Sequence, residues 1–376
     1  MTEQIPKSEE IEFKDKFIDR YSVLTDFEKF KEYSLSFLRR SIRVNTLKIS
    51  VKELVKRLEK KDWLLTPIPW CKEGFWIEHK GVEITDDEGN VELIKRRDVG
   101  NITEHTLGYF YIQEAASMIP PIVLMNPYNN NPSEKNSKNK ENYNCNDYKN
   151  NNQNEFILDM CASPGSKTTQ IGMYMKNQGI LMANDYKYDR IKSLGLNVQR
   201  CGLNNCVITL MMGHLFSKMG IEKFDRILVD APCSGTGTIR KSLKTLKIWN
   251  PNMVRRLCGQ QRQLLETGFK LLKKGGTLVY STCTLEPEED EGVISWLLDK
   301  YDGTASDEKN KNDKDKDFIK YGKAVTEDIK LHGLNRSEPI LEFEKERYND
   351  GVSRCLRIWP QDNDTEGFFV CKIRKI

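Results

Sequence analysis

Two cysteines stand where a thiol could act as a nucleophile. Cys233 comes shortly after the apolar run Phe224–Asp230, and Cys283 comes directly after the apolar run Thr277–Thr282. Both runs are typical of buried strands. Because ligands bind just beyond the carboxyl ends of the strands in an open α/β sheet, we expect both thiols and the carboxylate of Asp230 to face one cleft.

Two thiols beside a carboxylate are suited to covalent chemistry on a pyrimidine ring. The C5 atom of cytosine is a poor nucleophile, but a thiolate that adds to C6 makes C5 reactive towards a methyl donor. Cys283 and Cys233 could attack C6 and remove the C5 proton, while Asp230 could bind N3. A single strand-end cysteine is more often a buried apolar residue. Two of them, each within a small polar motif at the same sheet edge, favour the catalytic interpretation.

A second motif, Asp159–Gln170 (DMCASPGSKTTQ), follows an apolar strand and opens a helix. Gly165 permits a tight turn, where we expect a Cβ atom to crowd a ligand. Free N–H groups at the helix start, together with Lys167, could bind a carboxylate or a phosphate. The spacing matches neither a P-loop nor a dinucleotide fingerprint. Asp185 ends the next strand, where an acid can hold ribose hydroxyls, or alternatively cap a helix.

The order of the elements predicts an α/β fold with a mostly parallel sheet. Helical patterns separate the strands, the longest of them running from about Pro251 to Lys274, and an antiparallel hairpin closes the chain. This is the layout of a Rossmann-like S-adenosylmethionine methyltransferase, by fold analogy. The expected strands are Phe156–Met160, Ile180–Asn184, Cys206–Met211, Phe224–Asp230 and Gly276–Thr282, with a hairpin of Cys355–Trp359 and Gly367–Ile373.

A smaller α+β module is expected before this domain, over residues 1–105, with the methyltransferase domain over 106–376. Residues 1–40 read as helical, 39–48 as a basic strand, and 63–102 as β-rich with aromatic residues that favour a core. Ser50 is expected to cap the next helix. Residues 106–125 should form a strand and a short helix that Pro120 and Pro121 stop. Polar segments at about 128–154 and 301–320 are predicted disordered insertions.

Charge is distributed unevenly along the chain. Between Thr236 and Lys274 the only acid is Glu266, against ten Lys and Arg residues, which favours a polyanion across the cleft. Basic residues also exceed acids between Arg39 and Lys60, where a solvated helix face is the simpler interpretation and an RNA surface the alternative. The acids that crowd Glu286–Glu291 are explained by the dipole of a helix N-terminus.

Composition limits the remaining possibilities. The 376 residues carry a formal net charge of +4, and no apolar run could span a bilayer. The ten Cys are irregularly spaced without a secretion signal, so we expect reduced thiols and a cytoplasmic or nuclear location. With four scattered His and no CxxC pair, no metal site is predicted. A monomer is the expected state.

These motifs resemble the Nol/Nop/Sun-type RNA cytosine-5 methyltransferases. The resemblance is carried by Asp159–Lys167 (DMCASPGSK), Asp230–Lys241 (DAPCSGTGTIRK) and Tyr280–Asp290 (YSTCTLEPEED), and is supported by Arg43–Lys48 (RVNTLK), Gln113–Pro121 and Cys355–Gly367. It spans nearly the whole chain except the two insertions, and the chain is most similar to the compact archaeal-type members that methylate tRNA.

The resemblance implies a role for each matching residue. Cys283 would be the nucleophile, Cys233 would help to release the product, and Asp230 and Lys167 would contact the base. S-adenosylmethionine is the implied cofactor, and Arg43, Asn45, Arg240 and Lys241 are the implied RNA-binding residues. The implied cofactor-binding residues are Cys161, Ala162, Ser163, Pro164, Gly165, Ser166, Lys167, Asp185, Arg190 and Asp230.

One position departs from the family. Members usually have Asp-Gly-Arg after the third strand, with the acid near the adenine, whereas this chain has Met212-Gly213-His214. We therefore expect weaker cofactor binding. The predicted function is methyl transfer to C5 of cytosine in RNA, with tRNA favoured. The alternatives are the same reaction on rRNA, or a non-catalytic RNA-binding or ribosome-assembly factor.

Overall fold

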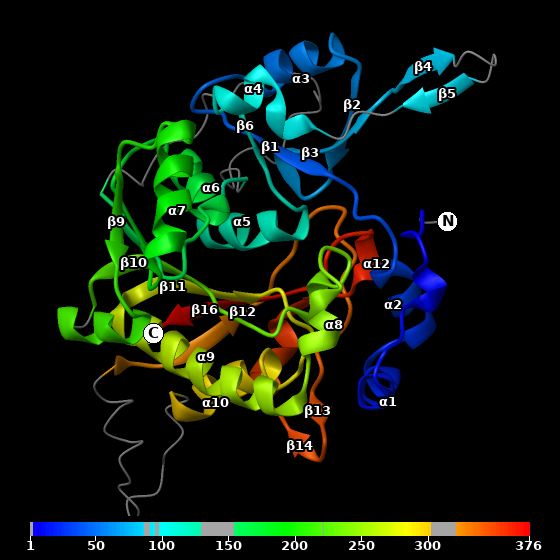
Figure 1. Cartoon of the computed structure of the whole chain (residues 1–376). Helices are drawn as coiled ribbons and strands as arrows, with labels where there is room; N and C mark the ends of the chain where they lie inside the picture. The colour runs from blue at the N-terminus through cyan, green and yellow to red at the C-terminus, as the bar shows by residue number, and fades with distance from the viewer. Residues whose placement is uncertain (1–2, 86–90, 95–97, 129–153, 221, 302–320) are drawn as a thin grey trace, which may run out of the picture.

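The computed structural model describes residues 3–85, 91–94, 98–128, 154–220, 222–301 and 321–376 (Figure 1). The two predicted insertions lie almost wholly outside these residues. Their flanking residues are packed: Tyr301 is fully buried, and the Tyr128 hydroxyl donates a hydrogen bond to Glu73 over 2.6 Å. Within the described ranges, no helix is long and apolar enough to cross a membrane.

An eight-stranded sheet forms the centre of the molecule, with the order β12-β16-β11-β10-β7-β8-β9 and β15 beside β16. The five strands from β9 to β11 are parallel, while β16 runs antiparallel to β11 and pairs antiparallel with β12 and β15. The predicted mostly parallel sheet with an antiparallel end is confirmed. Its strands are β7 (Phe156–Asp159), β8 (Ile180–Asp185), β9 (Cys206–Leu210), β10 (Phe224–Asp230), β11 (Leu272–Thr282), β12 (Ala324–Glu327), β15 (Leu356–Ile358) and β16 (Phe368–Lys375).

Helices cover both faces of this sheet (Figure 1). On one face lie α5 (Ile119–Met125), α6 (Ser166–Tyr174) and α7 (Tyr188–Cys201), and on the other η5 (Gly213–Met219), α9 (Pro251–Leu271) and α10 (Glu291–Lys300). The expectation for Pro120 and Pro121 was wrong, because they begin α5 rather than end it. Proline suits a first helical turn, where its missing N–H has no intrahelical acceptor.

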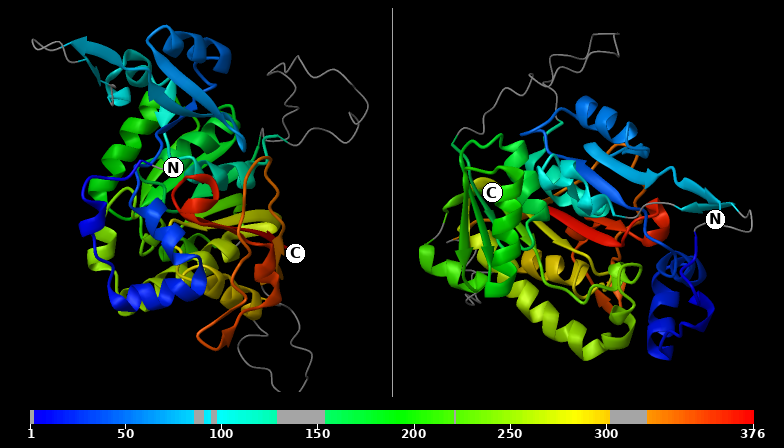
Figure 2. Two further views of the ribbon diagram at one scale, coloured as in Figure 1. Left: turned by 90° about the vertical axis from the view of Figure 1, so that its right-hand side faces the viewer. Right: turned by 45° about the horizontal axis from the view of Figure 1, so that its top comes forward.

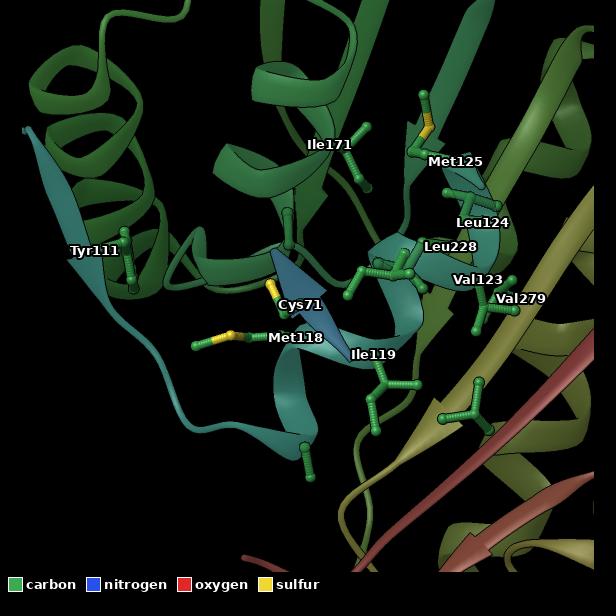
Figure 3. Packing of buried hydrophobic residues seen from close by; sticks show 14 of the residues in the cluster. Cys71, Tyr111, Met118, Ile119, Val123, Leu124, Met125, Ile171, Leu228 and Val279 are labelled. Atoms are coloured by element: carbon green, nitrogen blue, oxygen red, sulfur yellow. The ribbon is translucent and has the colours of Figure 1, made fainter. Parts of the chain in front are cut away.

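Helix α5 links the two parts of the core. Figure 3 shows its side chains Ile119, Val123 and Leu124 near Leu228 of β10 and Val279 of β11. Met118, which directly precedes α5, and Cys71, from a strand of the N-terminal sheet, belong to the same buried cluster. The small N-terminal sheet, described next, and the central sheet therefore share one continuous apolar cluster.

The N-terminal part of the chain forms a four-stranded sheet with the order β2-β3-β1-β6. Trp63 and Phe75 are buried in its core, and Ser50 caps α3 as expected, its hydroxyl accepting from the N–H of Glu53. Strand β6 lies beyond residue 105, within the segment assigned to the second domain. The elements here are β1 (Ser41–Val44), α3 (Val51–Glu59), β2 (Trp63–Ile68), β3 (Cys71–His79), β4 (Val82–Thr85), β5 (Val91–Ile94), η2 (Val99–Asn101), α4 (Thr103–Thr106), β6 (Phe110–Ile112) and η3 (Ala116–Met118).

The first two α-helices, α1 (Asp15–Leu24) and α2 (Phe27–Ser34), pack on the large domain instead of this small sheet (Figure 2). Phe17 and Tyr21 of α1 stack on each other and join Trp249 and Trp359 in one buried cluster. These helices therefore pack against the segments that follow β10 and β11. The remaining short elements are η1 (Ser8–Glu10), η6 (Thr236–Thr238), α8 (Lys244–Ile248), β13 (Glu342–Phe343), β14 (Glu346–Arg347), η7 (Asp350–Arg354) and α12 (Pro360–Asn363).

Candidate active site

The two predicted thiols meet at the carboxyl edge of the sheet. Strands β10 and β11 are parallel neighbours with Asp230 aligned to Ser281, so the segments that follow them leave the sheet side by side. The Sγ atoms of Cys233 and Cys283 lie 3.3 Å apart, and both side chains are partly buried. The hydrogen bond to Cys283 and burial hold the pKa of Cys233 well above its usual value. Cys233 therefore ionises less readily than an ordinary thiol.

Close backbone packing sets the distance between these loops. The N–H of Gly237 donates to the carbonyl of Cys283 over 3.0 Å, and the N–H of Gly367 donates to the carbonyl of Gly237 over 2.9 Å. A Cβ atom on Gly237 would stand 2.2 Å from the Gly367 carbonyl oxygen and 2.8 Å from that of Cys283. Only glycine fits there, and any side chain would push the two thiol loops apart.

A lysine–aspartate pair stands beside the thiols. Lys167 Nζ lies 2.6 Å from Asp230 Oδ2, and the Ser281 hydroxyl donates to Asp230 Oδ1 over 2.8 Å. Burial lowers the pKa of Lys167, but the charge and hydrogen bond of Asp230 outweigh it and the pKa lies above its ordinary value. Ser281 was not predicted; its place in the STCT motif was the available signal.

Lys167 lies in the first turn of α6, directly after the loop that precedes this helix. Gly165 has φ +104°, and a Cβ atom added there would meet Leu194 of α7 at 3.1 Å, so the backbone conformation and the packing on α7 both favour glycine. Arg190 donates to the carbonyl of Ser163 over 2.6 Å and ties the loop to α7. The loop is therefore held in place by its contacts with α7.

Two buried carboxylates end the neighbouring strands. Asp185 of β8 is 2% exposed, and it accepts from the N–H of Lys187 and lies 3.4 Å from Arg190 Nε. The helix cap of α7 is Lys187, so the alternative reading of Asp185 as that cap is not supported. Asp159 of β7 accepts from Thr168 through Oδ2, but its buried Oδ1 has no partner among the described residues. Burial raises the pKa of Asp159 to about 7.

The acidic run after Cys283 is a buried scaffold, which corrects the explanation by a helix dipole. Helix α10 begins only at Glu291, and Glu286, Glu289, Asp290 and Glu291 are all fully buried. Arg20 of α1 pairs with Glu286 over 2.7 Å. Arg357 of β15 pairs with Asp290 over 3.1 Å and with Glu291 over 2.5 Å. Partners so distant in sequence gave no local signal, so the sequence could not reveal this arrangement.

Two predicted RNA-binding residues lie inside the protein, which corrects that expectation. Arg43 is 1% exposed and bonds Gln113, the carbonyl of Ser166 and the hydroxyl of Thr169. Asn45 is 2% exposed and donates to the carbonyls of Gly108 and Cys201. Both side chains join the small sheet to α6 and α7, so neither can reach a phosphate in this structure.

Arg240 and Lys241 are adjacent in sequence but differ in environment. The Arg240 side chain is fully buried and binds Asp364 over 2.7 Å as well as the carbonyls of Phe37 and Thr365, so its predicted RNA contact is also corrected. The Lys241 side chain is 69% exposed and lies 3.8 Å from Glu366. Further along, exposed cations follow on α8 and the first half of α9: Lys244, Lys247, Arg255 and Arg256.

A parallel sheet with these motifs at its carboxyl edge defines a methyltransferase of the Rossmann-like class. Residues 148–374 match the family described as 16S rRNA methyltransferase RsmB/F, and residues 13–115 match the N-terminal domain of 16S rRNA methyltransferase RsmF. The chain belongs to the RsmB/F family of RNA cytosine-5 methyltransferases. It is thus an enzyme of a family whose implied methyl donor is S-adenosylmethionine.

Relatives differ in length and named substrate. The chain is 40% identical to the tRNA (cytosine(49)-C(5))-methyltransferase of Pyrococcus abyssi over 96% of both chains. It is also 40% identical to the ribosomal RNA small subunit methyltransferase F of Shewanella pealeana, over 93% of this chain but 61% of that protein.

Solved structures agree with the fold. A methyltransferase homolog protein from Pyrococcus horikoshii superposes with a TM-score of 0.72 at 31% identity, covering 97% of this chain and 96% of the other. NSun6 from Pyrococcus horikoshii with SFG gives a TM-score of 0.66 over 93% of this chain and 94% of that one. At 22% identity the second likeness concerns the fold alone.

The residues present fit the methyl donor that the family implies. Asp185 lies at a strand end where it could hold ribose hydroxyls, and the unpartnered Oδ1 of Asp159 offers a buried acceptor beside the loop. Met212 follows β9 and is 56% exposed, while Gly213 is buried against Met160 and Leu264. Met212 therefore occupies an exposed position after β9, and the presence of Met instead of an acid does not disturb the packing of Gly213.

Proposed function

We propose that this enzyme transfers a methyl group from S-adenosylmethionine to C5 of cytosine in RNA through a covalent bond between Cys283 and C6, with tRNA as its preferred substrate. The 3.3 Å separation of the Cys233 and Cys283 sulfurs, beside the Lys167–Asp230 pair, carries the proposal. Two thiols this close can act on neighbouring atoms of one ring.

Attack is assigned to Cys283. The Cys233 thiol can keep its proton and donate a hydrogen bond to the sulfur of Cys283, and such a bond stabilises a thiolate at the acceptor. The electron pair of the Cys283 sulfur forms the bond to C6, and the electrons of the C5–C6 double bond shift towards C5. Lys167 brings a positive charge beside the ring, and Asp230, held by Lys167 and Ser281, is placed to bind its N3 edge.

Release is assigned to Cys233. Hydrogen bonding to Cys283 is the first cause that raises the pKa of Cys233. Once Cys283 is bonded to C6, its sulfur is a thioether and accepts hydrogen bonds only weakly. Cys233 can then ionise more readily and take the C5 proton, and the C6–S bond breaks as the ring double bond reforms. The same contact thus protects one thiol before attack and frees it afterwards.

The methyl donor would supply an electrophilic methyl group when bound. The loop 161–167, Asp185, Arg190 and Asp230 are proposed to hold it. In this arrangement Asp185 would bind the ribose, and Arg190 would act mainly by fixing the loop and Asp185. The thioether of Met212 accepts hydrogen bonds only weakly compared with the usual acid, so weaker binding of the methyl donor remains the prediction.

The proposed RNA surface consists of Lys241, Lys244, Lys247, Arg255 and Arg256, hereafter the α8–α9 surface. All five are exposed, and they follow directly after the Cys233 loop. A run of one sign without intervening acids fits a phosphate backbone. It replaces Arg43, Asn45 and Arg240 as the place where RNA would lie.

Substrate preference rests on the extent of the matches. The relative named for tRNA matches this chain over 96% of its own length, whereas the ribosomal RNA small subunit methyltransferase F relative matches it over only 61% of its length. rRNA is the second candidate, because both matching families are described as 16S rRNA methyltransferases. Mapping of 5-methylcytosine by bisulfite sequencing, after purified protein acts on unmodified tRNA and 16S rRNA, separates them.

The covalent step is tested by replacing each thiol. Cys283→Ala should abolish methyl transfer and trapping on RNA that contains 5-azacytosine, while Cys233→Ala should let an RNA adduct accumulate. Methyl transfer that persists in Cys283→Ala would refute the mechanism. Calorimetric titration with S-adenosylmethionine addresses the non-catalytic alternative, which requires that no binding be observed.

A further inference from the structure

The peptide units on both sides of Cys233 are bound by two buried side chains. Glu289 Oε2 accepts from the N–H of Ser234 over 3.0 Å and from Gln261 Nε2 over 2.7 Å. The same Gln261 nitrogen donates its second hydrogen to the carbonyl of Pro232 over 3.0 Å. Both side chains are fully buried. Together they form a bracket around Cys233.

These contacts come from separate elements. Gln261 is on α9, while Glu289 is in the turn before α10, and Tyr280 fixes that turn by donating to the carbonyl of Glu289 over 2.7 Å. The orientation of the Gln261 amide is determined, because both of its partners are acceptors. The bracket therefore fixes the Cys233 loop both to α9 and to the turn before α10.

Cys283 is held by different bonds. Its carbonyl accepts from Gly237, and the hydroxyl of the preceding Thr282 donates to Asp290 over 2.6 Å. Strand pairing continues to Thr282, which lies opposite Phe369 of β16. Removal of Gln261 breaks none of these bonds, so the change acts directly on the Cys233 side of the pair.

We propose that Glu289 and Gln261 are positioning residues for Cys233 that act in the resolution of the covalent adduct and not in its formation. This inference rests on the proposed function. The bracket fixes the distance from the Cys233 sulfur to the C5 proton, and proton transfer requires hydrogen-bond reach.

The test uses Gln261→Leu, which keeps the shape and removes both donated bonds. With cytosine-containing RNA and S-adenosylmethionine, single-turnover methyl incorporation and the denaturation-resistant protein–RNA adduct are followed together. A displacement of about 1 Å can slow a step by up to about 100-fold, so we expect adduct resolution to slow at least about tenfold. Methyl incorporation should change by less than about twofold. Glu289→Gln, which keeps one acceptor for Ser234, should act in the same direction.

Gln260→Ala, an exposed neighbour on α9, is the matched control and should resemble the unmodified enzyme. Normal resolution in both Gln261→Leu and Glu289→Gln overturns the inference. So does an equal slowing of methyl incorporation and resolution with a lowered Tm, which indicates a purely structural role. If Cys283→Ala still forms the adduct, the proposed function itself fails, and that result is obtained before either bracket variant is interpreted.

Discussion

Two basic stretches of this chain look alike in sequence and differ in the folded protein. Arg43, in the small sheet, is buried and donates hydrogen bonds to groups of α6. The cations of the α8–α9 surface, such as Lys247 and Arg256, are exposed beside the Cys233 loop. The first stretch joins the two parts of the protein, and the second is available to a polyanion.

The difference shows that the density of positive charge does not by itself identify an RNA surface. A long guanidinium can reach carbonyl groups of several segments, and a buried one is retained because it satisfies them. Arg43, Arg240 and Arg357 all do this, with partners that are far away in sequence. Within the described residues, the side chains of the α8–α9 surface make no such hydrogen bonds to distant carbonyls, and Lys241 lies 3.8 Å from Glu366.

The largest effect is expected from Arg43→Met. It removes the donor to Gln113 Oε1 and the bonds to the Ser166 carbonyl and the Thr169 hydroxyl, which still bond to each other. A buried polar group left without a partner costs about 1–3 kcal/mol. We expect a loss of about 3 kcal/mol in the free energy of unfolding. Because Ser166 precedes Lys167, methyl transfer should also fall in the fraction that remains folded.

Urea denaturation and a methyl-transfer assay measure the two effects of Arg43→Met. Arg40→Met is the control, since Arg40 is exposed near the start of the same strand. If Arg43→Met were as stable as Arg40→Met and instead lost RNA affinity, Arg43 would belong with the surface cations and the comparison would fail.

The adjacent pair Arg240 and Lys241 tests the same contrast within one dipeptide. Arg240→Met removes bonds to Asp364 and to the carbonyls of Phe37 and Thr365, so we expect a loss of about 2 kcal/mol. Lys241→Ala should change stability by less than about 0.5 kcal/mol, because exposed ion pairs contribute little. Only Lys241→Ala should weaken RNA binding at unchanged stability. Equal destabilisation by both variants would contradict this assignment.

Much of the architecture could be read from the sequence because it depends on local pattern. The parallel strands appear as apolar runs, and their carboxyl ends placed Cys233, Cys283 and Asp230 at one edge, as the fold rules require. Ser50 was found for the same reason, since a helix cap is a local signal. Such features do not depend on distant partners.

What the sequence could not show depends on pairing across the chain. The acids after Cys283 can be buried because Arg20 and Arg357, which lie far from them in the sequence, form ion pairs with Glu286 and Asp290. Gln261 is an unremarkable residue in a helix until Pro232 and Glu289 are seen beside it. Pro120 was assigned to the wrong end of its helix, since proline marks both boundaries and the pattern around it was apolar throughout.

The smallest effect, and the sharpest test of the exposed stretch, comes from Arg256→Ala on α9. A cation that contacts one phosphate contributes about 0.7–0.9 to the slope of log K against log salt concentration. Removing it should lower that slope by this amount, so that the loss of RNA affinity between 50 and 200 mM salt becomes about threefold smaller than in the unmodified enzyme. Stability should not change, because the side chain is exposed. Lys192→Ala, on α7 across the sheet, is the control, and its slope should equal that of the unmodified enzyme. Equal slopes for Arg256→Ala and Lys192→Ala would show that RNA does not cross α9, and the α8–α9 surface would then be charged without being a binding site.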